Sequence, residues 1–593
     1  MRASTLLKAA PAALIASAVA IASAIALGVV GPAASASDEP AGPKSLVAAD
    51  IGVPNGDVIA NLWSWNWRSV AAECRDHLDP AGYGAVWVAP PGESLRHPGG
   101  VWWDIYQPYS YRLNGRFGSQ SDFTAMISTC HAAGIEVYTD AVVNHTAAQT
   151  GTGYDGTVLS DRYDPPMYDR GHYNVDVCDH AIDNWADQWE VQHCELLDLP
   201  DLDTSDPNVR GTLAGFLNAQ IGLGVDGFRV DAAKHIPAGE LQALVGQLND
   251  TTSGARPYVF QEVFPGQPPA PGDYFGAGDV LDFTYADKMK AAFQGDIATL
   301  SSFGPGWGIL PAANSVSFVT NHDTERNGQH LSYKDGATAT LANVFQLAWE
   351  HTTPTVYAGF DFANPDAAPP NSNGFVTDTT CGSGWHCLNR DPLVAGMVGW
   401  RGAVGGADVA NWQSPAGNVI GFGRGGTGFV AINNTGGAHT ATYTTGLAEG
   451  SYCNVLNGCA TSVTVASGRA TLTVPAKGAV AFHTGATGEP DPDRVSATFT
   501  VQAETNWGQN VYVVGDIAEL GAWNPAAAVP LTTGPGAYPR WSGGVSLPAN
   551  TDVAYKFVIR QDGQPVIWET GANRTVHTQS GGAQTVDGGS FRR

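Results

Sequence analysis

The chain is poor in basic residues. Its 593 residues include 30 Lys plus Arg against 56 Asp plus Glu, which gives a formal net charge of −26 at pH 7. Proteins that bind nucleic acid usually carry a basic patch or stripe, so this balance argues against DNA or RNA as a partner. The chain is also too long for one hydrophobic core, and we expect several domains.

Long hydrophobic runs are missing after the N-terminal segment. Residues 1–36 begin with Arg2 and Lys8, continue with an apolar run and end in Ala-Ser-Ala, which is the pattern of a secretory signal peptide with its A-x-A cleavage site. No later run is apolar for long enough to span a bilayer. We therefore expect a secreted, extracellular protein with no membrane partner.

The sequence also lacks a C-x-x-C pair, which makes metal ligation a weak interpretation of its eight cysteines. An even number of cysteines in an exported protein indicates disulfides instead. Spacing alone leaves many pairings open.

Short strand-like runs alternate with helix-like segments through the first two thirds of the chain. The runs are Val58–Trp63, Ala85–Val88, Ile135–Val143, Gly227–Asp231, Tyr258–Glu262, Val280–Tyr285, Val316–Asn321 and Thr355–Gly359. Eight strands joined by helical crossovers predict an α/β fold, a parallel (β/α)₈ barrel. In that fold the active site lies at the C-terminal ends of the strands.

The stretch from Gly227 to His235 carries the first chemical signal. It reads as a short buried strand, so alternation places Arg229 and Asp231 on one face near its C-terminal end. A neighbouring arginine lowers the pKa of a carboxyl group, and we expect Arg229 to keep Asp231 ionised and oriented, which suits a nucleophile. For an isolated R-x-D pattern, a structural ion pair is the alternative.

Three further stretches end apolar strands in polar residues: DAVVNH at 140–145, FQEVF at 260–264 and FVTNHD at 318–323. Together with Gly227–His235, this ordered set resembles the four signature regions of glycoside hydrolase family 13, the α-amylases. The likeness extends from about Val58 to the region of Cys459. Four ordered motifs are far more specific than any one of them, so a catalytic role for Asp231 is favoured over a structural ion pair with Arg229.

The resemblance implies a pair of catalytic carboxyl groups and a third that assists them. A retaining glycosidase needs a nucleophile and a general acid about 5–5.5 Å apart. Asp231 fits the first role, and Glu262 fits the second because the apolar residues around it and nearby carboxylates favour a retained proton. Asp323 matches the family's third carboxylate, which binds hydroxyls of the distorted sugar.

The resemblance also assigns residues that bind substrate. Trp102, Trp103, Tyr106 and Gln107 match the family segment WWxxYQP, in which Tyr106 stacks on the sugar being cleaved and the tryptophans line neighbouring glucose sites. The remaining substrate-binding candidates are His145, His322, Lys234, which would reach the reducing-side sugar, and Arg229.

The implied metal is Ca²⁺. The resemblance assigns side-chain oxygens to Asn144 and Asp201 and backbone carbonyls to Gln192 and His235, and a set of oxygen ligands suits calcium. Zinc prefers nitrogen and sulfur, and the nearby cysteines are better explained by a disulfide. Without the surrounding motif, Asn144 and Asp201 would be read as ordinary polar loop residues.

Resemblance to the animal-type enzymes, together with sequence proximity, suggests the cysteine pairs. They are Cys74 with Cys130, Cys178 with Cys194, Cys381 with Cys387, and Cys453 with Cys459. Two features depart from those relatives. The third basic ligand of their chloride site falls near Thr355, where no base occurs, so we expect no chloride activation. The Gly-rich loop after the last motif is shorter here, at Asn327–Ser332.

The organisation we expect has five parts. A signal peptide (1–36) precedes the catalytic barrel (37–390), which carries an inserted domain at about 146–200, because that connection is too long for a simple loop unless it is disordered. A C-terminal antiparallel β domain (391–484) follows, then a Pro-containing linker (485–494) and a β-sandwich module (495–593).

The last module resembles the starch-binding modules of carbohydrate-binding family 20. We expect Trp523 and Trp568 to form a sugar platform, with Lys556 and Asn573 as hydrogen-bonding neighbours and Trp507 near a family aromatic of uncertain role. Core packing is the alternative for each tryptophan, and it is our interpretation of Trp541.

These observations lead to one functional hypothesis, a calcium-dependent retaining endo-hydrolase that acts on starch and related α-1,4-glucans as a monomer. A maltooligosaccharide-forming or transglycosylating relative would share the same catalytic residues. A non-catalytic glucan-binding barrel is a rival from another class, but such proteins typically lose catalytic carboxylates, and Asp231, Glu262 and Asp323 are all present here.

Overall fold

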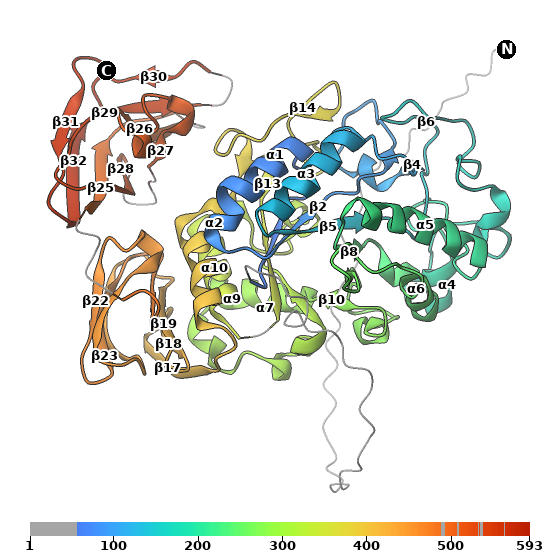
Figure 1. Ribbon diagram of the computed structural model, residues 1–593, viewed down its shortest axis with the longest axis horizontal. Coiled ribbons are helices and arrows are strands. Elements are labelled where there is room, and N and C mark those ends of the chain that lie inside the picture. The colour runs from blue at the N-terminus through green and yellow to red at the C-terminus, as the bar shows by residue number, and fades with distance from the viewer. Residues whose placement is uncertain are drawn as a thin grey trace, which may run out of the picture.

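The computed structural model describes residues 56–350, 352–487, 493–506, 509–531, 533, 538–561 and 564–593 (Figure 1). The predicted signal peptide, Trp507 and the centre of the predicted linker lie outside the described residues. Among the described residues, no helix is long and apolar enough to cross a membrane.

Eight parallel strands close into a barrel in the spatial order β1-β12-β11-β10-β9-β8-β5-β2, which confirms the predicted (β/α)₈ fold. They are β1 (Ile59–Asn61), β2 (Ala85–Val88), β5 (Glu136–Ala141), β8 (Gly227–Val230), β9 (Tyr258–Gln261), β10 (Asp279–Leu281), β11 (Ser315–Ser317) and β12 (Thr353–Tyr357). Gly227 is required in β8, because a Cβ there would lie 2.5 Å from the carbonyl oxygen of Tyr258 on β9.

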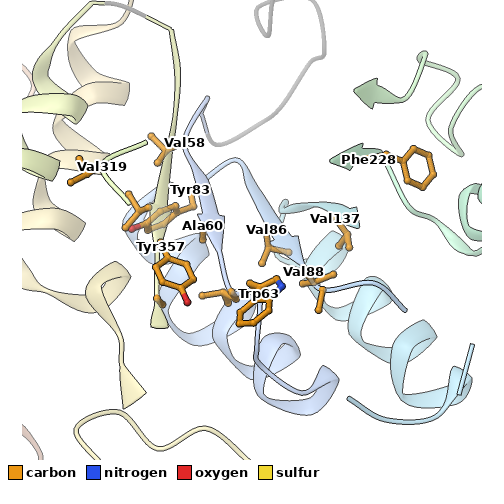
Figure 2. Packing of buried hydrophobic residues seen from close by; sticks show 14 of the residues in the cluster. Val58, Ala60, Trp63, Tyr83, Val86, Val88, Val137, Phe228, Val319 and Tyr357 are labelled. Carbon is orange, nitrogen blue, oxygen red and sulfur yellow. The ribbon is translucent and has the colours of Figure 1, made fainter. Parts of the chain in front are cut away.

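Helices cover the barrel from outside. They are α1 (Trp67–Glu73), α2 (Asp79–Ala81), α3 (Gln120–Ala132), α5 (Pro207–Leu223), α6 (Ala238–Val245), α7 (Phe283–Gln294), α8 (Thr324–Asn327), α9 (Ala337–Ala348) and α10 (Pro392–Val404). Gly224 ends α5 in the left-handed conformation and so turns the chain into β8. Apolar side chains from strands and helices fill the space between the two layers (Figure 2).

Two predicted elements differ from the structure. The run predicted as a strand over 280–285 ends at Leu281, because the Asp282 side chain accepts a hydrogen bond from the backbone N–H of Tyr285 and caps α7. The β-rich pattern expected after Arg390 begins only at Val409, because α10 comes first and packs on α9. The apolar face of α10 was not apparent in a stretch containing several glycines.

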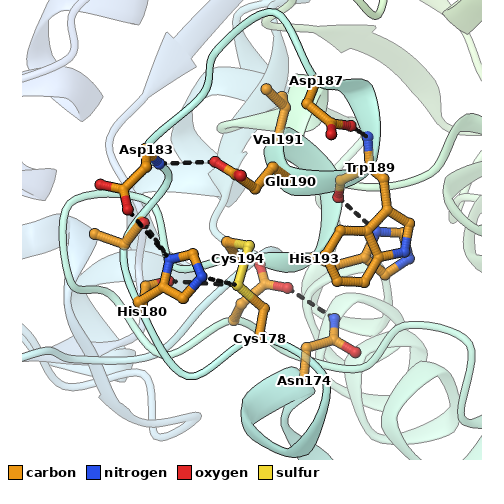
Figure 3. The surroundings of a disulfide bond; sticks show 12 residues. Asn174, Cys178, His180, Asp183, Asp187, Trp189, Glu190, Val191, His193 and Cys194 are labelled. Atoms are coloured by element: carbon orange, nitrogen blue, oxygen red, sulfur yellow. Dashed lines mark hydrogen bonds and ion pairs between the residues drawn. A yellow bond between two sulfur atoms is a disulfide. The ribbon is translucent and has the colours of Figure 1, made fainter.

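The connection after β5 is a small irregular unit. It contains the hairpin of β6 (Gly151–Thr152) and β7 (Val158–Leu159), then α4 (Gln188–His193). The Cys178–Cys194 disulfide fastens α4 to the preceding loop (Figure 3). The other three predicted disulfides are also confirmed, and they join Cys74 to Cys130, Cys381 to Cys387 and Cys453 to Cys459.

Short strands flank the barrel, namely β3 (Glu93–Ser94) with β4 (Pro108–Ser110), β13 (Gly359–Phe360) with β16 (Trp385–His386), and β14 (Asn371–Ser372) with β15 (Phe375–Val376). The next domain is antiparallel, and its strands are β17 (Val409–Ala416), β18 (Val419–Arg424), β19 (Gly428–Asn433), β20 (His439–Thr444), β21 (Gly450–Cys453), β22 (Ser462–Val465), β23 (Arg469–Val474) and β24 (Gly478–His483).

The C-terminal module is a sandwich of two sheets with a hydrophobic core of its own. One sheet contains β25 (Arg494–Gln502), β28 (Arg540–Pro548) and β32 (Gly582–Ser590). The other contains β26 (Asn510–Gly515), β27 (Val529–Pro530), β29 (Asp552–Arg560), β30 (Ile567–Trp568) and β31 (Arg574–His577).

Candidate active site

Carboxylates gather at the C-terminal ends of four barrel strands, of which β5, β8 and β9 are adjacent and β11 is separated from β9 by β10. Asp140 lies in β5, Asp231 and Glu262 directly follow β8 and β9, and Asp323 lies in the loop after β11. Since β5, β8 and β9 are adjacent in the barrel, their ends bring these side chains to one site. The structure thus brings together the three acids that the motifs singled out.

Arg229 holds three of these carboxylates at once. Its Nη1 lies 2.7 Å from Asp140 Oδ1 and 2.7 Å from Asp231 Oδ1, and its Nη2 lies 2.9 Å from Glu262 Oε2. The side chain of Arg229 is 0% exposed. The guanidinium of Arg229 lies buried against the acids, which favours a role in positioning them, and its predicted contact with substrate stays a prediction.

The net effect on Asp231 differs from the sequence expectation. Burial raises the pKa of Asp231 well above its ordinary range, Arg229 opposes this, and the charges of Glu262 and Asp140 add to the increase. The predicted contact with Arg229 is present, but one guanidinium does not offset the loss of water and several neighbouring carboxylates. In the free site, Asp231 is therefore harder to ionise than an aspartate in water.

Glu262 is anchored through one oxygen. Its Oε2 accepts a hydrogen bond from the backbone N–H of Ala232 at 3.0 Å as well as the contact from Arg229. Ala232 adopts a left-handed conformation with φ of 49°, which turns its N–H towards the acid. Besides the apolar residues and carboxylates expected around Glu262, the structure adds a cationic contact from Arg229 on the neighbouring strand. Oε1 remains for a substrate.

Asp323 is the most exposed of the three acids, with 29% of its side chain accessible. Burial, followed by the charge of Glu262, raises the pKa of Asp323 to about 7, although Arg229 and Arg326 oppose the increase. His322 Nε2 lies 3.3 Å from Asp323 Oδ2, and burial keeps the pKa of His322 well below its ordinary value. His322 is therefore a neutral neighbour of this acid.

Tyr106 is fixed by a chain of hydrogen bonds. Its hydroxyl donates to Asp140 Oδ2 at 2.6 Å and accepts from Trp63 Nε1 at 2.7 Å. The ring of Trp63 stacks on His322 with centroids 4.4 Å apart. Sequence reasoning missed Trp63 and gave Asp140 no role, although Trp63 ends a predicted strand and Asp140 opens a signature region.

Trp102 is partly exposed and packs against a buried arginine that sequence reasoning also missed. The guanidinium carbon of Arg326 lies 4.8 Å from the ring centre of Trp102, 5.0 Å from that of Phe360 and 4.7 Å from that of Phe362. Arg326 Nη1 donates to the carbonyl oxygen of Pro365 at 3.0 Å. The sequence signal that could have found Arg326 is its position three residues after Asp323.

Replacing Arg326 by Gln should shift the pH dependence of turnover. Arg326 lowers the pKa of Asp323, so without this charge Asp323 holds its proton to higher pH. The limb of the kcat/KM profile that reports ionisation of Asp323 should move to higher pH. Arg326→Lys is the matched control, since it keeps the charge and loses the planar stacking. If both variants had the parental profile, this electrostatic role would be wrong.

The other predicted substrate residues are placed as follows. Trp103 is partly exposed and packs against a small cluster of apolar side chains, and Gln107 is buried. His145 Nε2 lies 3.0 Å from the carbonyl oxygen of Tyr106, and its Nδ1 lies 3.3 Å from Asn144 Nδ2. Lys234 Nζ donates to the carbonyl oxygens of Phe264 and Gln267, both at 2.8 Å. Contact of these residues with a sugar stays a prediction.

The burial and chemistry of the predicted metal ligands suit a cation, and their joint coordination of one ion stays a prediction. Asn144, Gln192, Asp201 and His235 are all buried. Burial raises the pKa of Asp201 well above its ordinary value, and Asp201 Oδ1 is buried without a hydrogen-bond partner among the described residues. Asn144 Nδ2 lies 3.3 Å from His145 Nδ1, and the Asn144 side chain also hydrogen-bonds to Asp201. The amide oxygen of Asn144 is the ligand that the resemblance assigns. A hard divalent ion would satisfy these oxygens.

The sulfurs of the inserted segment serve no metal. Cys178, His180 and Cys194 lie close enough for a three-ligand group, but the two cysteines are joined in a disulfide, so no thiolate is available (Figure 3). At position 355, where the resemblance locates the third basic ligand of a chloride site, Thr355 is buried in β12. The expected absence of chloride activation stays a prediction.

In the C-terminal module, Trp568 is 38% exposed, and Asn573 is exposed as well. Trp568 pairs with Val558 across β29 and β30, so both side chains lie on one face, and Trp523 packs against the cluster that contains Val558. Trp541 is buried and donates to the carbonyl oxygen of Ala503, which confirms its interpretation as core.

Comparison with known families agrees with this arrangement. Residues 73–258 match the model for the alpha amylase catalytic domain, residues 410–485 match the alpha amylase C-terminal all-beta domain, and residues 494–587 match the starch binding domain. The matches fall on the barrel, the antiparallel domain and the C-terminal module.

Curated relatives and solved structures extend the comparison. The chain is 45% identical over 560 residues to an alpha-amylase from Streptomyces violaceus, covering 91% of this chain and 95% of the relative, and 42% identical to one from Thermomonospora curvata, covering 85% and 88%. The crystal structure of a mutant of alpha-amylase I from Eisenia fetida, in complex with maltohexaose, aligns with a TM-score of 0.70 and 32% identity over 73% of this chain and 98% of that one. This chain is a member of the α-amylase family and carries a starch-binding domain.

Proposed function

We propose that this starch-hydrolysing enzyme cleaves internal α-1,4-glucosidic bonds and retains the anomeric configuration. The observation that carries the proposal is the shared guanidinium of Arg229, which binds Asp231 through one terminal nitrogen and Glu262 through the other. Two carboxyl groups on one guanidinium are close together, as a retaining mechanism requires, whereas inversion needs a wider gap that admits a water.

The roles follow from which oxygens are free. Asp231 Oδ1 is held by Arg229, so Oδ2 is the oxygen that attacks the anomeric carbon. Glu262 Oε2 is held by Arg229 and by the N–H of Ala232, so Oε1 delivers a proton to the leaving oxygen. Water then attacks the glycosyl-enzyme ester while Glu262, now ionised, accepts a proton from that water, and Asp231 is released as a carboxylate. Asp323 binds hydroxyls of the distorted sugar.

Nuclear magnetic resonance of the first product tests the stereochemistry. Retention gives the α-anomer before mutarotation, and the β-anomer would overturn the proposal. Product lengths over time test internal cleavage. A rapid fall in iodine colour relative to reducing ends supports endo-cleavage, and release of a single small sugar from the start contradicts it.

We infer that Asn144, Asp201 and the backbone carbonyls of Gln192 and His235 hold Ca²⁺ between the barrel and the inserted segment. The support is the buried, unpartnered Oδ1 of Asp201. The ion would supply the positive charge that the described residues do not place beside this carboxylate. The proposed calcium site is close to the active site, since its ligand His235 directly follows the predicted substrate-binding residue Lys234 in the loop after β8.

Chelation of calcium should lower the thermal stability of the protein. An ion that binds only the folded state stabilises by mass action, about 2.7 kcal/mol when its free concentration is 100 times Kd. The measurement is a thermal melt with and without chelator, with metal content checked independently. Coincident curves for the loaded and metal-free samples would contradict the calcium site, as would Asp201→Asn melting like the calcium-loaded parent.

The C-terminal module should bind starch granules through the platform, which we define as Trp523 and Trp568. Lys556 Nζ lies 2.7 Å from the carbonyl oxygen of Gly571, beside the exposed Asn573, so polar groups border the aromatic surface. A separate binding site raises the effective concentration of an enzyme at an insoluble surface, and it hardly affects short soluble chains.

Truncation near Gly485, or Trp523→Ala with Trp568→Ala, should weaken adsorption to raw starch and leave hydrolysis of soluble oligosaccharides almost unchanged. Trp541→Ala is the matched control, because removal of a buried Trp costs about 3–5 kcal/mol and should unfold the module. Granule-binding isotherms and circular dichroism separate the cases. A folded double variant that adsorbs normally would rule out the platform.

A further inference from the structure

A polar cavity lies between the catalytic domain and the starch-binding module. Its volume is about 260 Å³. Asp361, Trp385 and His386 border it on the catalytic side, and Asn510, Tyr512 and Arg560 border it on the module side. It is close to the lower end of the roughly 300–1,000 Å³ range of small-molecule sites, which suits a short stretch of a chain.

The module wall of this cavity continues the face that carries the platform. On β26 and β29, Tyr512 pairs with Val558 and Asn510 pairs with Arg560, and Trp568 pairs with Val558 on the other side. Paired residues, and residues two apart along a strand, share a face of the sheet. The face therefore runs from Trp568 through Val558 to Arg560 at the cavity. β26 and β29 are labelled in Figure 1.

The catalytic wall of the cavity is the braced pair of antiparallel strands β13 and β16. Asp361 Oδ1 lies 2.6 Å from His386 Nε2, and the N–H of Asp361 donates to the carbonyl oxygen of Gly384 at 2.9 Å. The Cys381–Cys387 disulfide closes the loop that contains His386. These contacts hold a carboxylate and an imidazole at the cavity before any ligand arrives.

The same strand pair is connected to the active site by packed aromatic rings. Phe360, adjacent to Asp361, packs on Trp63 with centroids 6.5 Å apart. Trp63 in turn stacks on His322 beside Asp323. The strand pair that borders the cavity is thus linked to the catalytic site through Phe360, Trp63 and His322.

The groups around the cavity suit sugar hydroxyls. Asp361 and His386 are a carboxylate and an imidazole, Asn510 supplies an amide, and the Arg560 guanidinium lies 4.6 Å over the ring of Tyr512, which fixes its plane. Adjacent hydroxyls of a glucose unit donate to a carboxylate and accept from a guanidinium or amide. An uncharged polyol needs both kinds of partner, and the cavity has both.

We propose that this interdomain cavity is an additional α-1,4-glucan-binding site, which continues the platform across Arg560 to Asp361 and guides a long chain from the module to the catalytic domain. The proposal rests on the platform function proposed above. It adds residues outside the platform and outside the catalytic cluster.

The test uses the full chain with Glu262→Gln, so that ligands are not consumed, and isothermal titration with long-chain amylose and with maltotriose. Asp361→Ala with Arg560→Ala should weaken amylose binding about tenfold, as expected when a hydrogen bond to a charged group is lost, and leave maltotriose binding unchanged. The matched control is Arg540→Ala, which removes an exposed arginine from β28 in the other sheet of the module.

The outcomes separate this site from the platform. If Trp523→Ala with Trp568→Ala loses amylose affinity while Asp361→Ala with Arg560→Ala keeps it, the cavity proposal is wrong and the platform stands. If neither pair changes affinity, both are wrong. If the cavity variant alters only the radius of gyration in small-angle scattering, these residues merely hold the two domains together, and the proposal also fails.

Discussion

Glu262→Gln is expected to lower turnover of starch by about 10²–10⁴-fold, the usual contribution of a general acid. Gln keeps the shape of the side chain and an oxygen for Arg229 Nη2, so the fold should persist. Steady-state kinetics on soluble starch measures the loss, and circular dichroism checks the fold. A folded variant with near-normal turnover would show that another group supplies the proton.

Asp231→Asn is the matched comparison. It should lose at least as much activity, because the covalent step needs a carboxylate. An α-glycosyl fluoride should distinguish the two variants by their first-step rates, because its leaving group needs no protonation. Glu262→Gln should recover much of its first-step rate on this substrate, whereas Asp231→Asn should not. The opposite pattern would exchange the two roles.

Arg229→Met should be the most destabilising single substitution at the site. Removing one partner of a buried ion pair costs about 3–5 kcal/mol of unfolding free energy, and Arg229 serves three carboxylates. Arg229 lowers the pKa of Asp140, Asp231 and Asp323 against burial, so these groups should hold their protons to higher pH in the variant. Turnover should fall as well, since Asp231 and Glu262 lose their common anchor.

The sign of the pH effect follows from linkage. The pKa of these carboxyl groups is raised in the folded protein, so the folded state binds protons more tightly than the unfolded chain, and more so in the variant. The stability lost in Arg229→Met should thus be greater at pH 8 than at pH 5. Denaturant unfolding at both pH values measures it.

Arg116→Met is the control for the Arg229 substitution. Arg116 is equally buried and pairs with Asp104 at 2.6 Å, but it touches none of the catalytic acids. Arg116→Met should destabilise the protein but leave the pH–rate profile unshifted, whereas in Arg229→Met the higher pKa values of the catalytic carboxyl groups should shift it. If the two variants had identical pH–rate profiles, the electrostatic role of Arg229 would be unsupported.

The sequence predicts the parts of this molecule that depend on local pattern. Short apolar runs ending in Asp231, Glu262 and Asp323 place the acids at strand ends, and a parallel barrel brings strand ends together whatever the exact strand limits are. All four disulfides follow from family resemblance together with the pairing of consecutive cysteines along the chain.

The remaining features depend on contacts between distant segments. Trp63 bonds to Tyr106, and Arg326 packs against Phe360 and Phe362, which no local periodicity indicates. The pKa of Asp231 is a balance between burial and charges carried by four strands, so its direction needed the assembled site. Helix α10 was missed because its burial is set by packing on α9.

The central claim is that Asp231 forms the covalent bond while Glu262 handles the proton. The most direct test is mass spectrometry of Glu262→Gln after rapid quenching during turnover of an α-glycosyl fluoride, a condition in which the glycosyl-enzyme should accumulate because its hydrolysis lacks a general base. We expect one added glycosyl unit on the peptide that contains Asp231. A label on a different residue, or turnover of the fluoride with no labelled enzyme at any time, would contradict the assignment.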